Sequence, residues 1–519
     1  MSLKPLTAVV VLSLATCGCV ELLVDQSQTG RIPANHYVAP DGTTPPAGTG
    51  SRDQPWDLAT ALAGADGAIH SGDTVWLRGG VYPGKFATSI SGRAGAPIVF
   101  RAAPGERAIL QDSTIGPGVD DQLIVHGSWL VFWGLELYNA HPDRGGIGLE
   151  PGNEEVAGAY RPGNVVNDGN HNRYVNLVIH DGGVAFYSYA DRFDIELVGS
   201  IIYNNGWQAA DRGHGHAVYV RSNTGPIVIR DNVLFNQFGG GVHAYSDPGV
   251  EGIQGILMDG NVAFDNGSIA ASSAANILLG GGTGALAQRD TVRANMAYVS
   301  PALAEVPDSE IPNISVGFEA VRQHDVQVVD NYAVGGNPAL DVREWERATV
   351  RRNVTEGPAL LVRLSEQPDA SYAWSANTHY GDSLRAAWVF GDVALTFGGW
   401  KSLTGLGTTD SAVAELPRAA RVFVRPNPDE HGRAIIVVYN WPGAGSVAVD
   451  LRTVLRRGEP YAIHNVQALF GPAISAGIYD GSLVDLAMSG VEPPPPIGTA
   501  QRVAPITGPA FDVFLVTQQ

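Results

Sequence analysis

Cysteine is nearly absent from this sequence. The 519 residues contain only two, Cys17 and Cys19, and both lie within the first twenty residues. Once that segment is cleaved or modified, no pair of cysteines is left to build a disulfide framework. The stability of the mature chain must therefore come from apolar burial and hydrogen bonding.

Basic residues are also scarce. The chain has 33 Lys and Arg against 52 Asp and Glu, so its formal net charge is −19. An acidic protein repels nucleic acid and anionic membrane surfaces, and we expect no nucleic-acid partner. Only 16% of the residues are charged, whereas 64 are Gly and 44% are hydrophobic. That composition favours a protein built from strands and tight turns.

The first nineteen residues have the pattern of an export signal. The apolar stretch Ala8–Leu14 follows a lysine and is too short to span a membrane. Leu14–Cys17 is similar to the lipobox of bacterial lipoproteins, in which the cysteine receives a lipid anchor. We therefore predict a signal over residues 1–19, with either lipidation at Cys17 or Cys19 or simple cleavage. The protein would be a bacterial outer-membrane or periplasmic lipoprotein, or an extracellular protein.

A degenerate repeat runs from about Val125 to Leu364. One polar residue followed by apolar residues recurs at spacings of 24, 32, 29, 34, 36 and 22 residues, starting at Asn176, Ser200, Asn232, Asn261, Asn295, Asn331 and Asn353. Such a unit cannot bury its apolar face alone, but stacked units bury a continuous core. The repeated Asn can adopt left-handed backbone geometry at a bend and bond to the same Asn one coil away. With a strand before and after each copy, this predicts an all-β fold, a right-handed parallel β-helix.

The repeat also predicts the domain boundaries. A linker over residues 20–35 would lead to a β-helix with an N-terminal cap over residues 36–410. Residues 411–519 alternate apolar and polar positions as antiparallel strands do, and they predict a C-terminal β-sandwich accessory domain.

Strand alternation predicts which side chains line the outer face of one sheet. Tyr219 and Arg221 would point outward from one strand, with His243 and Tyr245 beside them on the next. Glu319 would extend this face. A groove along it would have an aromatic and basic floor.

A turn at the entrance to this sheet gathers further polar residues. The repeat register places His180 in one column with Asn204, Asn236 and Asp265, while Trp207 could stack on a sugar ring. Asn and Asp in such columns are also ordinary structural turn residues. The candidate catalytic residues are His243, Tyr245, Asp211, His214, His216 and Asp181. The candidate substrate-binding residues are Arg221, Tyr219, Trp207, His180 and Glu319.

A metal site is a second interpretation of part of this cluster. His214 and His216 are two apart, so in a strand both would face one side, and Asp211 could join them on a transition metal. Calcium could instead be held by Asp side chains on loops. The sequence identifies no third protein ligand, so it leaves open whether the cofactor is calcium, a transition metal or none.

Three short segments near the N-terminus, Tyr37–Gly42, Gly72–Val75 and Gly79–Tyr82, resemble the start of β-helix polysaccharide lyases and related glycoside hydrolases. Trp400–Gly405 resembles the closing segment of secreted β-helix carbohydrate enzymes. Gly213–Gly215 matches one short motif of the polygalacturonases, but their paired Asp motifs are missing, so their mechanism is not carried over. The resemblance implies a β-helix that acts on polysaccharide.

The leading hypothesis is a monomeric enzyme that cleaves a polysaccharide along the Tyr219 and His243 face. Hydrolysis would need two carboxylates, for which the candidates are Asp181, Asp211 and Glu319. β-Elimination would need a base, for which His243 or Tyr245 are candidates, and Arg221 to neutralise a uronate. The low Lys content and the negative charge favour hydrolysis. The alternative is a noncatalytic glycan-binding or structural cell-surface protein.

Overall fold

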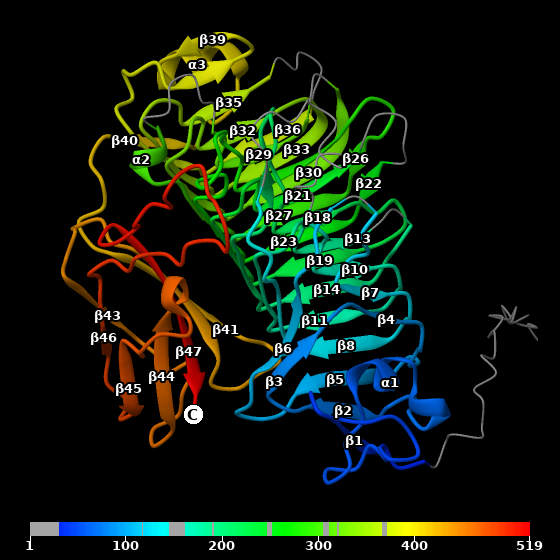
Figure 1. Ribbon diagram of the computed structural model, residues 1–519. Helices are drawn as coiled ribbons and strands as arrows, with labels where there is room; N and C mark the ends of the chain where they lie inside the picture. The colour runs from blue at the N-terminus through cyan, green and yellow to red at the C-terminus, as the bar shows by residue number, and fades with distance from the viewer. Residues whose placement is uncertain are drawn as a thin grey trace, which may run out of the picture.

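The computed structural model describes residues 31–116, 118–144, 161–188, 191–246, 252–304, 311–318, 321–365 and 371–519. Three sheets of twelve strands each run along its larger part (Figure 1). Successive strands enter the three sheets in turn, and neighbours pair in parallel except at the last strand of sheet 2. The fold is the right-handed parallel β-helix that the repeat predicts.

The strands of each sheet are short. Sheet 1 contains β1 (Asn35–Val38), β2 (Thr74–Leu77), β5 (Ile98–Ala102), β8 (Leu130–Trp133), β11 (Arg173–Val175), β14 (Ile195–Val198), β19 (Ile227–Arg230), β23 (Ile256–Asp259), β27 (Asp290–Arg293), β30 (Gln323–Val329), β33 (Trp345–Arg351) and β36 (Ser371–Ser375). Sheet 2 contains β4 (Phe86–Thr88), β7 (Leu123–Val125), β10 (Val165–Asn167), β13 (Phe186–Ser188), β18 (Val218–Val220), β21 (Val242–Ser246), β25 (Ile277–Gly281), β29 (Ile314–Val316), β32 (Leu340–Val342), β35 (Val362–Leu364), β38 (Trp388–Phe390) and β39 (Val393–Leu395). Sheet 3 contains β3 (Gly80–Pro83), β6 (Ala108–Asp112), β9 (Glu136–Asn139), β12 (Val178–His180), β15 (Ile201–Tyr203), β20 (Val233–Phe235), β24 (Val262–Phe264), β28 (Met296–Tyr298), β31 (Tyr332–Val334), β34 (Val354–Glu356), β37 (Thr378–Tyr380) and β40 (Ser411–Val413).

Short helices cover the ends of the coil, where an apolar core would otherwise meet water. Helix α1 (Leu58–Leu62) begins after Asp57, whose carboxylate accepts a hydrogen bond from the Thr60 amide. Helix α3 (Phe397–Thr404) buries Phe397 and Trp400 at the other end. A further short helix, α2 (Pro301–Ala304), follows β28. None of the helices in the described part of the chain is both long and apolar enough to cross a membrane.

Alternation along each strand separates the core from the outer face. In β18 and β21 the inward residues, Val218, Val220, Val242 and Ala244, are fully buried. The residues between them are partly exposed on the outer face. The same alternation in coil after coil produces one continuous core along the helix.

A ladder of asparagine side chains runs inside one corner of the coil. From Asn232 to Asn377, the Nδ2 of each Asn donates to the Oδ1 of the next at 2.9–3.0 Å. The predicted amide ladder is therefore present. The left-handed backbone, however, belongs to the residue before the ladder Asn in several coils, as at Asp231 and Asp330, and not to the Asn itself.

Asn176, the first residue of the predicted repeat, lies outside this ladder. Its amide donates to Glu430, and its carbonyl oxygen accepts from Asn427. The position equivalent to the ladder Asn is one residue later in that coil, because Val178 pairs with Ile201.

The C-terminal part of the described chain is an antiparallel β-sandwich. One sheet contains β41 (Arg421–Pro426), β42 (Ala434–Tyr439), β47 (Phe511–Gln518), β44 (Pro460–Asn465) and β45 (Ser475–Ile478), and the other contains β43 (Ser446–Val449) and β46 (Val484–Ala487). Apolar side chains between the two sheets form its own core. The last parallel strand, β40, lies just past the predicted boundary at residue 410 and still pairs with β37.

The sandwich packs on the outer face of sheet 3 (Figure 1). Aromatic and aliphatic residues of sheet 3, such as Phe264 and Tyr298, contact Tyr439 and Phe511 of the sandwich. This burial removes from water a face of the helix that would otherwise be an exposed apolar patch.

The segment before β47 also lies across the turns of the β-helix. The Pro494 carbonyl accepts from the Asn204 side chain, the Ile497 amide donates to Asp181, and the Gln501 amide donates to the Ile269 carbonyl. Residues far apart in the sequence are held together by these bonds.

The first prediction concerns the ladder. Asn295→Ala should lower stability by about 2–4 kcal/mol, because it leaves the backbone and side-chain N–H groups of Asn261, and the Met258 carbonyl, without a buried partner. Chemical unfolding against the exposed control Asn35→Ala measures the difference. Equal unfolding midpoints for the two variants would contradict a structural role for the ladder.

The second prediction concerns Asp265, which is 1% exposed and accepts hydrogen bonds from the Ser300 amide and hydroxyl at 2.7 and 2.6 Å. Burial raises the pKa of Asp265 to about 7, although the Ser300 bonds oppose that shift. Because the folded pKa is above the unfolded one, stability is lost as the pH rises towards and through 7. Asp265→Asn should remove this loss and stabilise the protein by on the order of 2 kcal/mol at pH 8.

Urea unfolding at pH 4 and pH 8 tests this expectation. The stabilisation should be present at pH 8 and absent at pH 4, where the wild-type carboxyl holds its proton. A difference that does not change with pH would show that the charge of Asp265 is not its cause.

Candidate functional site

A groove lies over the outer face of sheet 2 at β18 and β21. Its volume is ≈ 700 Å³, and it is lined by Val184, Trp207, Arg212, His214, Gly215, His216, Tyr219, Gly240, Val242, His243, Tyr245, Ser273, Ala274, Ala275, Leu278 and Phe318. Seven of the eleven site residues expected from the sequence lie close to one another here: Trp207, Asp211 through its contact with His214, His214, His216, Tyr219, His243 and Tyr245.

The floor of the groove is set by strand register. Tyr219 of β18 pairs directly with His243 of β21, as strand alternation predicts. The column continues to Tyr187 on one side and Leu278 on the other. Because successive outward positions are about 4.8 Å apart across a parallel sheet, these side chains touch.

The aromatic rings of the floor contact one another. The His243 ring lies 4.4 Å from that of His216 and 5.3 Å from that of Tyr219, measured between centroids. Tyr245 meets His243 edge to face at 5.2 Å and Phe318 at 4.6 Å. The two imidazoles are thus held between two tyrosines.

His216 is oriented by the backbone of the next coil. The Gly240 amide donates to its Nδ1 at 2.9 Å, so in the neutral ring Nε2 carries the proton and can act as a donor. A side chain at Gly239 would meet the Gly215 carbonyl oxygen at 2.2 Å and the His216 ring at 3.1 Å. Glycine at this point is what lets the two coils approach.

The surroundings of both imidazoles favour their neutral forms. Burial lowers the pKa of His216 well below its usual range, and the nearby His243 and Arg212 lower it further. Burial, with a smaller contribution from Arg212, lowers the pKa of His243 to about 3. The rings are nevertheless only partly covered and form part of the groove wall. Such a site offers uncharged nitrogen atoms rather than imidazolium ions.

A small hairpin forms one wall. Strands β16 (Trp207–Gln208) and β17 (Gly213–His214) pair antiparallel, and their connecting turn carries Asp211 and Arg212. The Asp211 carboxylate lies 2.9 Å from His214 Nε2 and 3.4 Å from the Arg212 guanidinium. Trp207 is only 6% exposed and stacks on His214, so it supports this wall and does not offer the free stacking face expected from the sequence.

The structure does not support the predicted metal site. Gly215 has a φ of +86°, which ends β17, and the His214 and His216 rings contact different neighbours. No three His, Cys, Asp or Glu side chains among the described residues are arranged to hold a metal ion.

His180 and Asp181 were expected at the rim, and this expectation was wrong. His180 pairs in register with Tyr203, not Asn204, and its ring is stacked between Tyr138 and Tyr203 on sheet 3. Although burial opposes the shift, hydrogen bonds to Asp181 and Glu136 raise the pKa of His180. No residue pattern in this coil marks the one-residue offset.

Asp181 is a structural residue on the same side. It is 3% exposed, forms an ion pair with the buried Arg144, and accepts the Ile497 amide at 2.8 Å. Its backbone is left-handed, with a φ of 57°. Both residues thus hold the turn and the C-terminal segment, away from the groove.

Arg221 and Glu319 were also expected to bind substrate in the groove. Arg221 lies one residue beyond β18, where its amide donates to the Ser188 carbonyl, and it does not line the groove. Glu319 lies outside the described residues, as do Cys17 and Cys19. The cation that lines the groove is Arg212. In the sequence, only the position of Arg212 between the candidates Asp211 and His214 indicated that it could belong to the site.

Comparisons with known proteins give distant similarities. No family model matches the sequence. Over 239 residues the chain is 26% identical to pectate lyase L from Thermoclostridium stercorarium, a match that covers 45% of this chain and 18% of that protein. The chain thus spans less than a fifth of that relative. A solved rhamnogalacturonan lyase is 17% identical, with a TM-score of 0.49, over 63% of this chain and 83% of its own. Pectate lyase Pel9A is 17% identical, with a TM-score of 0.44, over 67% and 78%. At low identity, the chain is similar to carbohydrate-active β-helix enzymes.

Proposed function

We propose that this protein cleaves an acidic polysaccharide by β-elimination in the groove over β18 and β21. The observation that carries the proposal is the pair of neutral imidazoles, His216 and His243, between Tyr219 and Tyr245. A neutral imidazole can accept a proton, and a phenol can deliver one, without a metal ligand set.

The reaction assigns a role to each group. His243 removes the proton from C5 of a uronate, and the electron pair forms the C4–C5 double bond while the C4–O bond breaks. Tyr245 gives a proton to the departing oxygen. Arg212 neutralises the uronate carboxylate, and the Nε2–H of His216 donates to it, because its Nδ1 is occupied by Gly240. A bound carboxylate would also favour the protonated state of His243 after proton transfer.

The sequence favoured hydrolysis, but the groove supports hydrolysis less well than β-elimination. A pair of carboxylates flanking the scissile bond is required for that reaction. None of the described residues that line the groove is Asp or Glu. Asp211 is bound to His214 and Arg212, and Asp181 lies in a buried ion pair elsewhere. These arrangements favour a His and Tyr mechanism.

One curated relative has a name consistent with this proposal. The curated protein matched over 239 residues is a pectate lyase. Export through residues 1–19, lipidation at Cys17 or Cys19 and a monomeric state remain predictions.

The third prediction tests the base. His243→Ala should lower the rate of unsaturated-uronate formation on its polysaccharide about 10²–10⁴-fold, because it removes the proton acceptor. Reducing ends and ultraviolet absorbance are followed together on a panel of acidic and neutral polysaccharides. The control is His431→Ala, an exposed histidine in the sandwich that is paired with Glu459.

The outcomes separate three functions. Reducing ends without ultraviolet absorbance would mean hydrolysis and would overturn the proposal. Saturable binding of a polysaccharide without turnover by the wild-type protein would mean a noncatalytic binder. Equal rates for His243→Ala and His431→Ala would exclude His243 as the base.

The fourth prediction concerns pH. The base must be neutral, and the pKa of His243 is lowered to about 3, so kcat/KM should stay level as the pH falls from 7 to about 5. A histidine with an ordinary pKa near 6.5 would lose about tenfold or more over that range. An acid limb centred near pH 6.5 would show that a different, unburied group is the base.

A further inference from the structure

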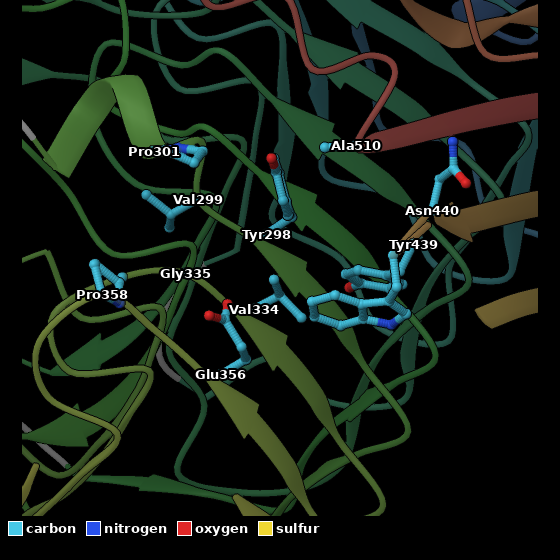
Figure 2. Close-up of a pocket in the computed structure, with 12 residues that line it drawn as sticks. Tyr298, Val299, Pro301, Val334, Gly335, Glu356, Pro358, Tyr439, Asn440 and Ala510 are labelled. Carbon is cyan, nitrogen blue, oxygen red and sulfur yellow. The ribbon is translucent and has the colours of Figure 1, made fainter. Parts of the chain in front are cut away.

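A second cavity lies between the β-helix and the sandwich, far along the helix from the N-terminus (Figure 2). Its volume is ≈ 230 Å³. We call it the junction cavity, and it is lined by Tyr298, Val299, Pro301, Val334, Gly335, Gly336, Glu356, Pro358, Tyr439, Asn440, Trp441 and Ala510. It belongs to sheet 3, whereas the groove of the proposed enzyme belongs to sheet 2.

Most polar groups around the junction cavity are already bonded to the protein. The Tyr439 hydroxyl donates to the Ala297 and Tyr332 carbonyls at 3.2 and 3.3 Å. The Trp441 indole N–H donates to the Tyr332 hydroxyl, and the Asn440 amide donates to two carbonyls. A ligand rich in hydroxyl groups would find few free partners here.

Glu356 is the exception. Figure 2 shows its side chain beside Val334, near Pro358 and Gly335. No ion pair joins its carboxylate to a cation within the described ranges. The nearest guanidinium, that of Arg385, donates instead to the Gly357 and Pro358 carbonyls at 3.1 Å. Burial raises the pKa of Glu356, although the Gly335 amide and Arg385 oppose this.

Aromatic rings from both domains line the junction cavity, Tyr439 and Trp441 from the sandwich and Tyr298 from β28. Tyr439 stacks with Trp441 at 6.4 Å and meets Tyr298 edge to face at 6.4 Å between centroids. A cation over an aromatic face is attracted by the ring electrons, and the attraction grows when water is excluded. A carboxylate without an ion-pair partner among the described residues and several rings around a cavity of ≈ 230 Å³ thus have the same ligand preference.

We propose that the junction cavity binds a small organic cation, an alkyl or quaternary ammonium group, through Glu356 and the rings of Trp441, Tyr439 and Tyr298. The ammonium lies against the carboxylate, and its apolar substituents pack on the rings, Val299 and Val334. The ligand contacts both domains, so its binding also strengthens their docking.

Calorimetric titration of the full-length protein with choline tests the proposal. Its neutral carbon isostere, 3,3-dimethyl-1-butanol, has nearly the same shape without the charge. Choline should bind at least about tenfold more tightly than the isostere, which corresponds to about 1.4 kcal/mol. Binding should weaken as the pH falls, because protonation removes the Glu356 charge.

Variants locate the binding. Glu356→Gln keeps the shape of the side chain and should lower choline affinity about tenfold, and Trp441→Leu should do the same. Glu415→Gln, at a site 81% exposed in the side chain, should leave affinity unchanged. Equal binding of choline and the isostere to the wild-type protein, no binding of choline, or tighter binding of a neutral monosaccharide would each overturn the proposal. The wild-type comparison stands even if a variant fails to fold.

Discussion

In-register backbone pairing between coils is the constraint on which the rest of this structure depends. Each strand pairs in parallel with its equivalent one coil away, so a residue type that recurs at one position becomes a column. Apolar columns form the core, amide columns satisfy the buried bends, and an outward aromatic column forms the floor of the groove. The distance between Tyr219 and His243 is therefore a property of the sheet and not of two flexible side chains.

This constraint explains why the pKa values of the two groove histidines are lowered. The rings sit on the outer face of a sheet, and the next coil crowds the His216 ring through Gly239 and Gly240, so burial disfavours their protonated forms. In a protein of net charge −19, the groove has Arg212 and no described carboxylate on its lining. Arg212, which also pairs with Asp211, thus supplies a local positive charge for an anionic substrate on a molecule whose net charge is negative.

The alternation of inward and outward residues in strands, together with the sequence repeat, predicts much of the fold and part of the site. Alternation alone predicts the pairing of Tyr219 with His243, because an outward residue stays outward in a strand. The predicted position of His180 was wrong, because the register of its coil is offset by one residue and no neighbouring residue indicates that offset. The predicted roles of Asp181 and Trp207 were wrong because of tertiary contacts. The distant segment at Ile497 bonds to Asp181, and Trp207 stacks on His214 within the hairpin.

The segment around Ile497 adds a consequence for how the molecule is assembled. It follows every coil in chain order, yet it bonds to Asp181, Asn204 and the Ile269 turn, beside the hairpin that forms the groove wall. During synthesis, the coils emerge and can stack before this segment exists. These turns therefore obtain their last hydrogen-bond partners only once residues 494–501 have been made.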